Sequence, residues 1–301
     1  MRLVTFDQAG QPTTGLLLQD RVVELAVAAK HCGEKLDASS VLAIVQAGDT
    51  GVQALRRIAA RAGEFAAVTH ALASLQMLAP IPVPARNVFC VGRNYVDHVK
   101  EGYSAQQVEV KLPEVPQFFT KATHAVNAPQ GDIRLDAKVT RRMDYEVELV
   151  VVIGKRGRDI SKAQAFDYVY GYSVGNDITA RDLQRRHDQW FKGKSLDTTF
   201  PFGPSLVTRD EIAEVTALQL SLSVNGEARQ QAHVSQMIFD IPAIIESLSA
   251  GLTLEPGDII ATGTPSGVGY AMNPPQYLKD GDLVVAGITE LGELRNKVVA
   301  V

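Results

Sequence analysis

The run MDYEVELVVVIGK, residues 143–155, combines a strand-like apolar pattern with two carboxylates. Successive side chains of a strand point to opposite faces, so Glu146 and Glu148 share a face with Val150 and Val152. The other face is wholly apolar or aromatic, and we therefore expect both faces to be buried. Two buried carboxylates about 6 to 7 Å apart need a partner, which a divalent cation would supply. The alternative is an exposed edge strand whose two Glu side chains are solvated.

Residues 1–79 are predicted to form a small α+β domain. RLVTF and GLLLQDRVVEL have strand patterns, the second as a hairpin that turns at Gln19-Asp20. Two helical patterns follow, SSVLAIVQAG and TGVQALRRIAARAG, each with a Ser or Thr that can cap its start and a Gly at its end. Prolines at positions 80, 82 and 84 favour an extended connection, so we place a domain boundary there.

Residues 80–301 are predicted to be the catalytic domain. Many short strands at irregular spacing, with a hairpin at Asn225-Gly226, favour a mixed α/β, β-rich fold over a doubly wound sheet. Helices are predicted in RNYVDHVKEGY, where Gly102 would end the helix, and in SKAQAFDYV and DIPAIIESLSAG. The polar segment 103–117 is a candidate for a mobile cover over a site.

One pair in the first of these helices suggests acid-base chemistry. His98 and Glu101 stand three residues apart and share a helical face, so the carboxylate can orient the imidazole as a base. A surface ion pair is the other interpretation. Spacing alone favours it, because exposed pairs of this kind are common on helices and contribute little.

Composition excludes several classes of protein. With 301 residues, 46% of them hydrophobic and 21% charged, the chain can bury a large core and is not disordered. A net charge of -4 lacks the basic excess that phosphate binding requires, so no nucleic-acid partner is expected. Cys32 and Cys90 form no disulfide or thiolate metal pattern, and no apolar run could span a bilayer. We therefore expect a cytoplasmic protein without a membrane partner.

Three familiar motifs are matched only in part. Residues 171–175 fit the GxSxG pattern around Ser173, yet the helix that should follow the serine at once begins late, with Thr179 as its predicted cap. Gly193-Lys194-Ser195 ends like a phosphate loop, but Asp188 stands where that loop requires a Gly. GTPSGVG lacks the GxGxxG spacing. A serine hydrolase is therefore a minor alternative, and nucleotide binding is disfavoured.

A set of carboxylates predicts a metal site more convincingly than these motifs predict a nucleophile or a nucleotide site. Asp177 lies at the end of the predicted strand YGYSVGND, and with Glu146 and Glu148 it would make a set of hard carboxylates suited to Mg²⁺, Mn²⁺ or Ca²⁺. Alone, Asp177 is equally well explained as a turn or cap residue. Basic and amide groups follow at Arg181, Gln184 and Lys194, as a carboxylate substrate would need. For Arg181 the alternative is a structural ion pair with Asp182 or with Glu residues nearby.

Five blocks together resemble the fumarylacetoacetate hydrolase family, from about Val88 to the C-terminus. They are GRNYVDHVKE, YEVELVVVIGK, GYSVGNDITARDLQ, KGKSLDTTFPFGP, and IIATGTPSGVG with the strands after it. The resemblance implies a β-roll-like catalytic domain, a homodimer, and a divalent metal that acts on small-molecule 2-keto acids. It also implies Glu146, Glu148 and Asp177 as metal ligands.

The same resemblance implies roles for the remaining candidates. His98 and Glu101 resemble the family's catalytic dyad, and Gln184 and Lys194 resemble its oxyanion groups. Arg181 and Thr264 look like substrate-binding residues. Tyr95, Phe118 and Trp190 are candidates for contact with the distal end of a substrate, although each could equally belong to the core. The chain has Gly92-Arg93-Asn94 where fumarylacetoacetase itself has a further Asp ligand, which resembles the acylpyruvate hydrolase and hydroxyheptadienedioate isomerase branch.

The leading expectation is hydrolysis of a carbon-carbon bond in an acylpyruvate-like 2,4-diketo acid, as in aromatic compound catabolism, with water activated by His98. The alternative keeps the site but isomerises, tautomerises or decarboxylates a 2-keto or 2-hydroxydienoic acid of the oxaloacetate or hydroxymuconate type. A binding protein without catalysis is a further alternative. All the enzyme readings share an enolised keto acid, so the sequence does not separate them.

Overall fold

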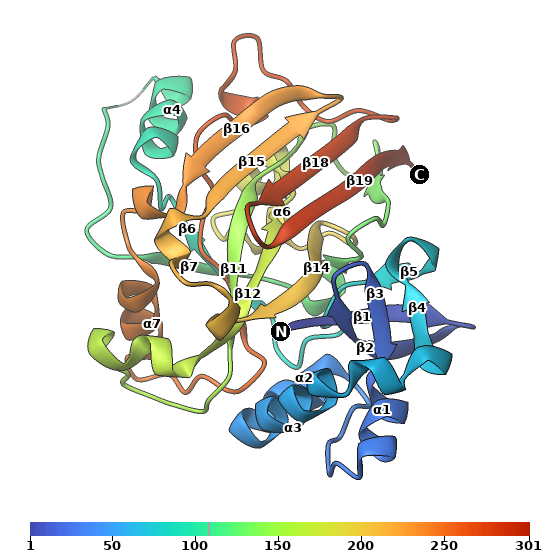
Figure 1. Cartoon of the computed structure of the whole chain (residues 1–301). Helices are drawn as coiled ribbons and strands as arrows, with labels where there is room; N and C mark the ends of the chain where they lie inside the picture. The colour runs from blue at the N-terminus through green and yellow to red at the C-terminus, as the bar shows by residue number, and fades with distance from the viewer. Residues whose placement is uncertain (108) are drawn as a thin grey trace.

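The computed structural model describes residues 1–107 and 109–301. Within these residues two β-sheets face each other (Figure 1). The larger sheet has twelve strands. Ten of them lie in the order β4 (Thr69–Ala71), β3 (Arg21–Glu24), β2 (Gln11–Leu18), β1 (Arg2–Gln8), β14 (Phe200–Thr208), β12 (Val169–Asn176), β11 (Val147–Ile153), β17 (Ile259–Ala261), β6 (Val88–Gly92) and β7 (Gln117–Lys121). Of the other two, β5 (Gln76–Leu78) pairs with β1, and β8 (Val126–Asn127) pairs with β14. The smaller has the order β16 (Glu227–His233), β15 (Gln219–Val224), β18 (Leu283–Ile288), β19 (Gly292–Ala300) and β9 (Ile133–Leu135).

The described residues also form the α-helices α1 (Leu25–Cys32), α2 (Val41–Gln46), α3 (Gly48–Ala60), α4 (Val96–Gln106), α5 (Arg181–Arg186), α6 (Phe191–Lys194) and α7 (Ile241–Ser249). Helices α1, α2 and α3 are grouped near the N-terminal strands of the larger sheet (Figure 1). A two-stranded pairing of β10 (Met143–Asp144) with β13 (Thr179–Ala180) lies beside the start of β11. The observed architecture is the predicted mixed α/β, β-rich fold.

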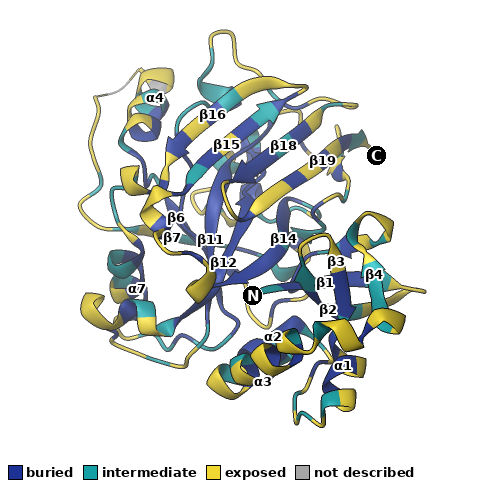
Figure 2. Cartoon of the chain, viewed as in Figure 1, coloured by how far each residue is buried: buried dark blue, intermediate teal, exposed yellow. Residues whose placement is uncertain are grey.

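Strand β11 is a central strand of the larger sheet, which decides whether Glu146 and Glu148 belong to a buried strand or to an exposed edge. It pairs with β12 on one side and β17 on the other, and β11 and β12 are buried along their whole length (Figure 2). Val147, Leu149 and Val151 pack into the core between the two sheets. Val150 and Val152 pack into a second core under the N-terminal helices. The edge-strand alternative for Glu146 and Glu148 is therefore wrong.

The predicted domain boundary falls within a continuous sheet. Strand β1 pairs with β14, with Arg2 opposite Val207 and Leu3 opposite Leu206. The core under the N-terminal helices also joins residues from before and after position 80. The N-terminal segment therefore extends the sheet of the larger one, and its division from residues 80–301 as a separate domain stays a prediction.

Most short-range predictions are confirmed. The hairpins turn at Gln19-Asp20 and at Asn225-Gly226, where Asn225 and Gly226 both have positive φ, as a tight two-residue turn requires. Ser40 caps α2, accepting a hydrogen bond from the Ala43 amide. Helix α3 begins at Gly48, earlier than its predicted cap at Thr50.

Three helix predictions need correction. Helix α4 continues past Gly102 and ends before Gln107, whose φ of 56° closes it. Residues 162–168 form a 3-10 helix instead of an α-helix. In the predicted cover, residues 103–106 belong to α4, and Val108 lies outside the described residues. No helix in the described part of the chain combines the length and apolar character needed to cross a membrane.

Candidate metal centre and catalytic site

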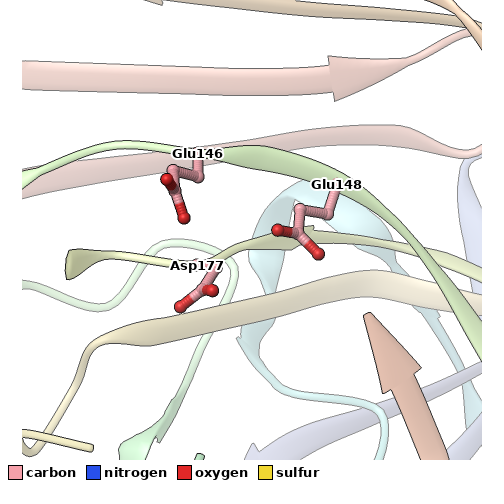
Figure 3. Close-up of side chains that lie close together, drawn as sticks. All are labelled: Glu146, Glu148 and Asp177. Atoms are coloured by element: carbon pink, nitrogen blue, oxygen red, sulfur yellow. The ribbon is translucent and has the colours of Figure 1, made fainter. Parts of the chain in front are cut away.

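Three carboxylates from two adjacent strands meet at the centre of the fold. Glu146 directly precedes β11 and Asp177 directly follows β12, and the Asp177 amide donates to the Glu146 carbonyl at 2.8 Å. One oxygen from each of Glu146, Glu148 and Asp177 lies within 4.8 Å of the others, and Figure 3 shows the side chains lying close together. Antiparallel pairing of β11 with β12 thus brings together the acids that the sequence separates by thirty residues.

Buried cations surround two of these acids. The Lys194 Nζ lies 2.5 Å from Glu146 Oε2 and 2.6 Å from Asp177 Oδ2. Arg181 donates from Nη2 to Glu146 Oε1 at 2.6 Å. Lys121, which has no exposed surface, donates to Asp177 Oδ1 at 2.7 Å. The Asp177 side chain therefore pairs with two lysines and does not serve as the acceptor of a turn or a helix cap.

Glu148 has no such partner. Its Oε2 accepts a hydrogen bond from the Gly263 amide at 2.8 Å, and no cation within residues 1–107 and 109–301 forms an ion pair with it. Burial and the neighbouring carboxylates of Asp177 and Glu146 raise the pKa of Glu148 well above its ordinary value. For Glu146 burial also opposes ionisation, but Arg181 and Lys194 outweigh it and lower the pKa.

The charge balance fits a divalent cation. With all groups ionised, the buried carboxylates of Asp144, Glu146, Glu148 and Asp177 outnumber the buried cations by one. These cations are Lys121, Arg181 and Lys194. The donors are carboxylate oxygens without nearby His or Cys, the set that Mg²⁺, Mn²⁺ and Ca²⁺ prefer. Glu146, Glu148 and Asp177 are the residues that would hold such an ion.

His98 and Glu101 form a fixed pair on α4. His98 Nδ1 lies 2.8 Å from Glu101 Oε1, and Glu101 Oε2 accepts a hydrogen bond from the Gly267 amide at 2.8 Å. His98 is only 8% exposed, so the surface ion pair interpretation is wrong. Because Nδ1 is occupied, Nε2 is the ring nitrogen left to act on a substrate.

A cavity of about 340 Å³ connects these groups. Its walls include seven of the predicted site residues, namely His98, Glu146, Glu148, Arg181, Gln184, Lys194 and Thr264, and the predicted Trp190. Arg181 donates to the Gln184 side chain at 3.1 Å, which confirms that the two share a helical face. Thr264 accepts a hydrogen bond from the Gln230 side chain at 2.8 Å. Its hydroxyl hydrogen therefore stays available to a ligand.

Two aromatic candidates lie elsewhere. Tyr95 does not line this cavity but a smaller pocket, and its buried hydroxyl has no hydrogen-bond partner in the described part of the chain. Phe118 packs against the core between the sheets, and its neighbour Phe119 lines the cavity instead. The placement of Tyr95 as a substrate contact is therefore not supported, because its pocket lies apart from His98 and Glu148.

Two predicted local pairings are also corrected. Arg181 pairs with Asp144 and Glu146, whereas Asp182 accepts a hydrogen bond from Thr140. Thr179 does not cap α5, which begins after Ala180. Its hydroxyl lies 3.3 Å from Glu146 Oε2 and 2.9 Å from the carbonyl oxygen of Asp177.

Sequence reasoning missed Asp144 and Lys121. Asp144 had a local signal, because it continues the alternation that places Glu146 and Glu148 on one face. It accepts from Arg181 and from the amides of Gly269 and Tyr270. No local pattern pointed to Lys121, since a Lys that ends an apolar strand is ordinarily solvated. Only the tertiary fold brings the end of β7 to Asp177, because three strands lie between β7 and β12 in the sheet.

Ser173 is a structural residue. It is fully buried in the middle of β12, and the carbonyl oxygens of Gly203 and Ser205, at 3.1 and 2.8 Å, share its one hydroxyl hydrogen. No strand-turn-helix elbow surrounds it, so the serine hydrolase alternative lacks its geometry.

Replacing Ser173 by Ala is therefore expected to leave enzymatic activity within about twofold and to lower the free energy of unfolding by about 1 to 2 kcal/mol, because two buried carbonyl groups lose their donor. Steady-state rates and chemical denaturation measure the two effects. Loss of activity in a folded Ser173→Ala protein would restore the serine hydrolase alternative.

The chain is similar to known enzymes along essentially its whole length. It is 43% identical to oxaloacetate tautomerase YisK of Bacillus subtilis (strain 168) over 304 residues, which cover 99% of this chain and 100% of that protein. The structure of a fumarylacetoacetate hydrolase from psychrophilic Exiguobacterium antarcticum superposes with a TM-score of 0.81 at 37% identity, covering 100% of both chains.

A third relative was crystallised with ligands. Maleylpyruvate hydrolase from Sphingobium sp. SYK-6, in complex with manganese(II) and pyruvate, is 28% identical with a TM-score of 0.78, covering 100% of this chain and 99% of the other. Residues 87–299 match the family described as fumarylacetoacetate (FAA) hydrolase C-terminal. The region that matches includes every carboxylate of the central cluster. This chain belongs to the fumarylacetoacetate hydrolase family.

Proposed function

We propose that this protein is an oxaloacetate tautomerase, which interconverts the enol and keto forms of that acid. The observation that carries the proposal is the 43% identity to the Bacillus subtilis oxaloacetate tautomerase along essentially the whole of both chains. The site suits the reaction, because the His98 imidazole, with Nε2 left available, lines the same cavity as Glu146 and Glu148. The tautomerase is one of the alternatives that the sequence left open, and it replaces hydrolysis as the leading proposal.

In the enol-to-keto direction C3 gains a proton and the enol hydroxyl loses one, so no water is consumed. His98 Nε2 is the group placed to carry the proton at C3, and Glu101 holds the ring in one tautomer and orientation. A divalent ion held by Glu146, Glu148 and Asp177 would supply a Lewis acid for the oxygens of the 2-keto acid.

The other residues of the cavity wall would bind and orient the substrate. Gln184 and Thr264 offer an amide and a hydroxyl to the substrate carboxylate. Burial lowers the pKa of Lys194, but Asp177 and Glu146 raise it more, so the net shift is upward and this side chain stays a cation. It can therefore stabilise negative charge on a substrate oxygen without donating its proton.

Hydrolysis remains a second candidate. It is supported by the maleylpyruvate hydrolase structure, whose pyruvate and manganese show that a related fold holds a 2-keto acid with a metal. The identity to that protein is lower, at 28%, than to the tautomerase. Assembly as a homodimer and a cytoplasmic location stay predictions.

The test is a comparison of products. With Mg²⁺ or Mn²⁺, the purified protein is expected to accelerate the decay of the ultraviolet absorbance of enol-oxaloacetate without release of carbon dioxide, and EDTA is expected to remove the acceleration. Maleylpyruvate and fumarylpyruvate serve as hydrolysis substrates in parallel. Failure to accelerate the enol decay, with cleavage of either pyruvate derivative, would favour hydrolysis and contradict the proposal.

A further inference from the structure

Arg93 is a cation at the cavity that the metal and acid-base chemistry does not use. It lies between β6 and α4, with a φ of 56°, and lines the same cavity as His98 and Glu148. Arg181 and Lys194 are each paired with two carboxylates. Arg93, by contrast, forms no ion pair within the described residues. A guanidinium left without a carboxylate in a binding cavity is a candidate anion receptor.

Aromatic rings hold this guanidinium in place. Its central carbon lies 5.2 Å from the ring centroid of Tyr103 and 5.8 Å from that of Trp190, and Nη1 donates to the Tyr103 hydroxyl at 3.0 Å. Trp190 is itself fixed, with its ring edge-on to Phe119 at 5.4 Å. Gly92 permits the arrangement, because a Cβ there would stand 2.6 Å from the Trp190 ring. The ring contacts orient Arg93 without neutralising its charge.

We propose that Arg93 binds the distal carboxylate of a dicarboxylic 2-keto acid and so selects diacids over monoacids. The proposal rests on the proposed function, in which the acidic cluster holds the keto-acid end of oxaloacetate. The second carboxylate of that substrate then needs a partner in the same cavity. An oriented guanidinium provides two parallel N–H donors that match a carboxylate.

One other cation competes for this role. Arg185 also lines the cavity and has no ion pair within residues 1–107 and 109–301. It is exposed, however, and its guanidinium lies 5.5 Å from the centroid of one ring, Tyr270, over which Arg181 also lies. Arg93 is only partly exposed and contacts two rings of its own, so the geometry favours Arg93.

The experiment compares enol-oxaloacetate with its 4-ethyl ester, in which the distal carboxylate is replaced by an uncharged ester group. Arg93→Gln keeps an unbranched side chain at the same backbone conformation. It is expected to lower kcat/KM for the diacid about 10- to 100-fold, mainly through KM, and to leave the ester within about twofold. Arg93→Lys should recover part of the loss. Arg186→Gln, at an exposed position of α5 outside the cavity, is the matched control and should change the rate with neither substrate.

A second measurement separates this inference from the proposed function. Trp190 is the only tryptophan in the chain, so its fluorescence reports ligand binding beside Arg93 even without turnover. If the wild-type protein converts neither compound, the proposed function fails. Tighter binding of the diacid than of the ester, lost in Arg93→Gln, would still support the receptor. Equal effects of Arg93→Gln on the two compounds, no effect on either, or loss of diacid preference in Arg185→Gln instead would overturn it.

Discussion

Replacing Glu148 by Gln is expected to abolish tight binding of a divalent metal and to lower activity about a thousandfold. The reason is that an amide contributes no charge to a site that depends on hard anionic ligands, and several kcal/mol of Lewis-acid stabilisation is lost with the ion. Calorimetric titration with Mn²⁺ measures the affinity, and decay of enol-oxaloacetate measures the activity.

The same variant has a second, less obvious consequence for stability. Glu148 is the carboxylate without a cationic partner, and burial beside two other acids raises its pKa. In EDTA, Glu148→Gln is therefore expected to melt at or above the temperature of the wild-type protein, because a repulsive interaction is removed.

Glu146→Gln is the matched control for this effect. Glu146 pairs with Arg181 and Lys194, and its removal leaves two buried cations short of a partner, so a loss of about 3 to 5 kcal/mol in the free energy of unfolding is expected. The assignment of Glu148 as the uncompensated ligand would be wrong if Glu148→Gln kept wild-type metal affinity or melted below Glu146→Gln.

Replacing His98 by Gln is expected to lower kcat about 10²- to 10⁴-fold, the usual contribution of a positioned general acid or base, while Mn²⁺ affinity stays unchanged. An amide of similar size fills the position but cannot take up or release a proton at the pH of the assay. Single-turnover rates and a metal titration on the same preparation check both parts.

Glu101→Gln tests how the dyad works. Glu101 accepts from the Gly267 amide and contacts His98 Nδ1, so a Gln there would keep the first bond and present N–H to the ring. The imidazole proton would then move to Nε2, which can no longer act as a base, and a loss of about 10²-fold or more is expected. Nitrogen NMR of the imidazole reports the tautomer. Wild-type rates with an inverted tautomer would show that His98 does not act through Nε2.

Much of the acidic cluster could be predicted from local pattern. The period-two alternation of residues 143–155 places Glu146 and Glu148 on one face, and the wholly apolar opposite face indicates a central strand. The spacing of His98 and Glu101 fixes their contact within one helical turn in the same way. The order of the five blocks was enough to predict the family, which the match over residues 87–299 confirms.

The reaction could not be predicted from the same residues. An acid-base pair beside a hard-metal site serves hydrolysis, tautomerisation and decarboxylation alike, and the sequence analysis favoured hydrolysis. Similarity to the tautomerase over the whole chain favours the alternative instead. Among the aromatic candidates for the distal end of a substrate, Trp190 lines the cavity, whereas Tyr95 and Phe118 do not.

Backbone periodicity sets which side chains share a strand or helix face within a few residues, so the amino-acid sequence alone predicts those relations. The charge balance of the site depends on the fold, since Lys121 reaches Asp177, the Gly263 amide reaches Glu148, and Trp190 reaches Arg93 from segments far apart in the chain. Whether a buried charge has an opposite charge or a hydrogen-bond donor beside it depends on which groups from distant segments pack against it. No local sequence pattern specifies that packing.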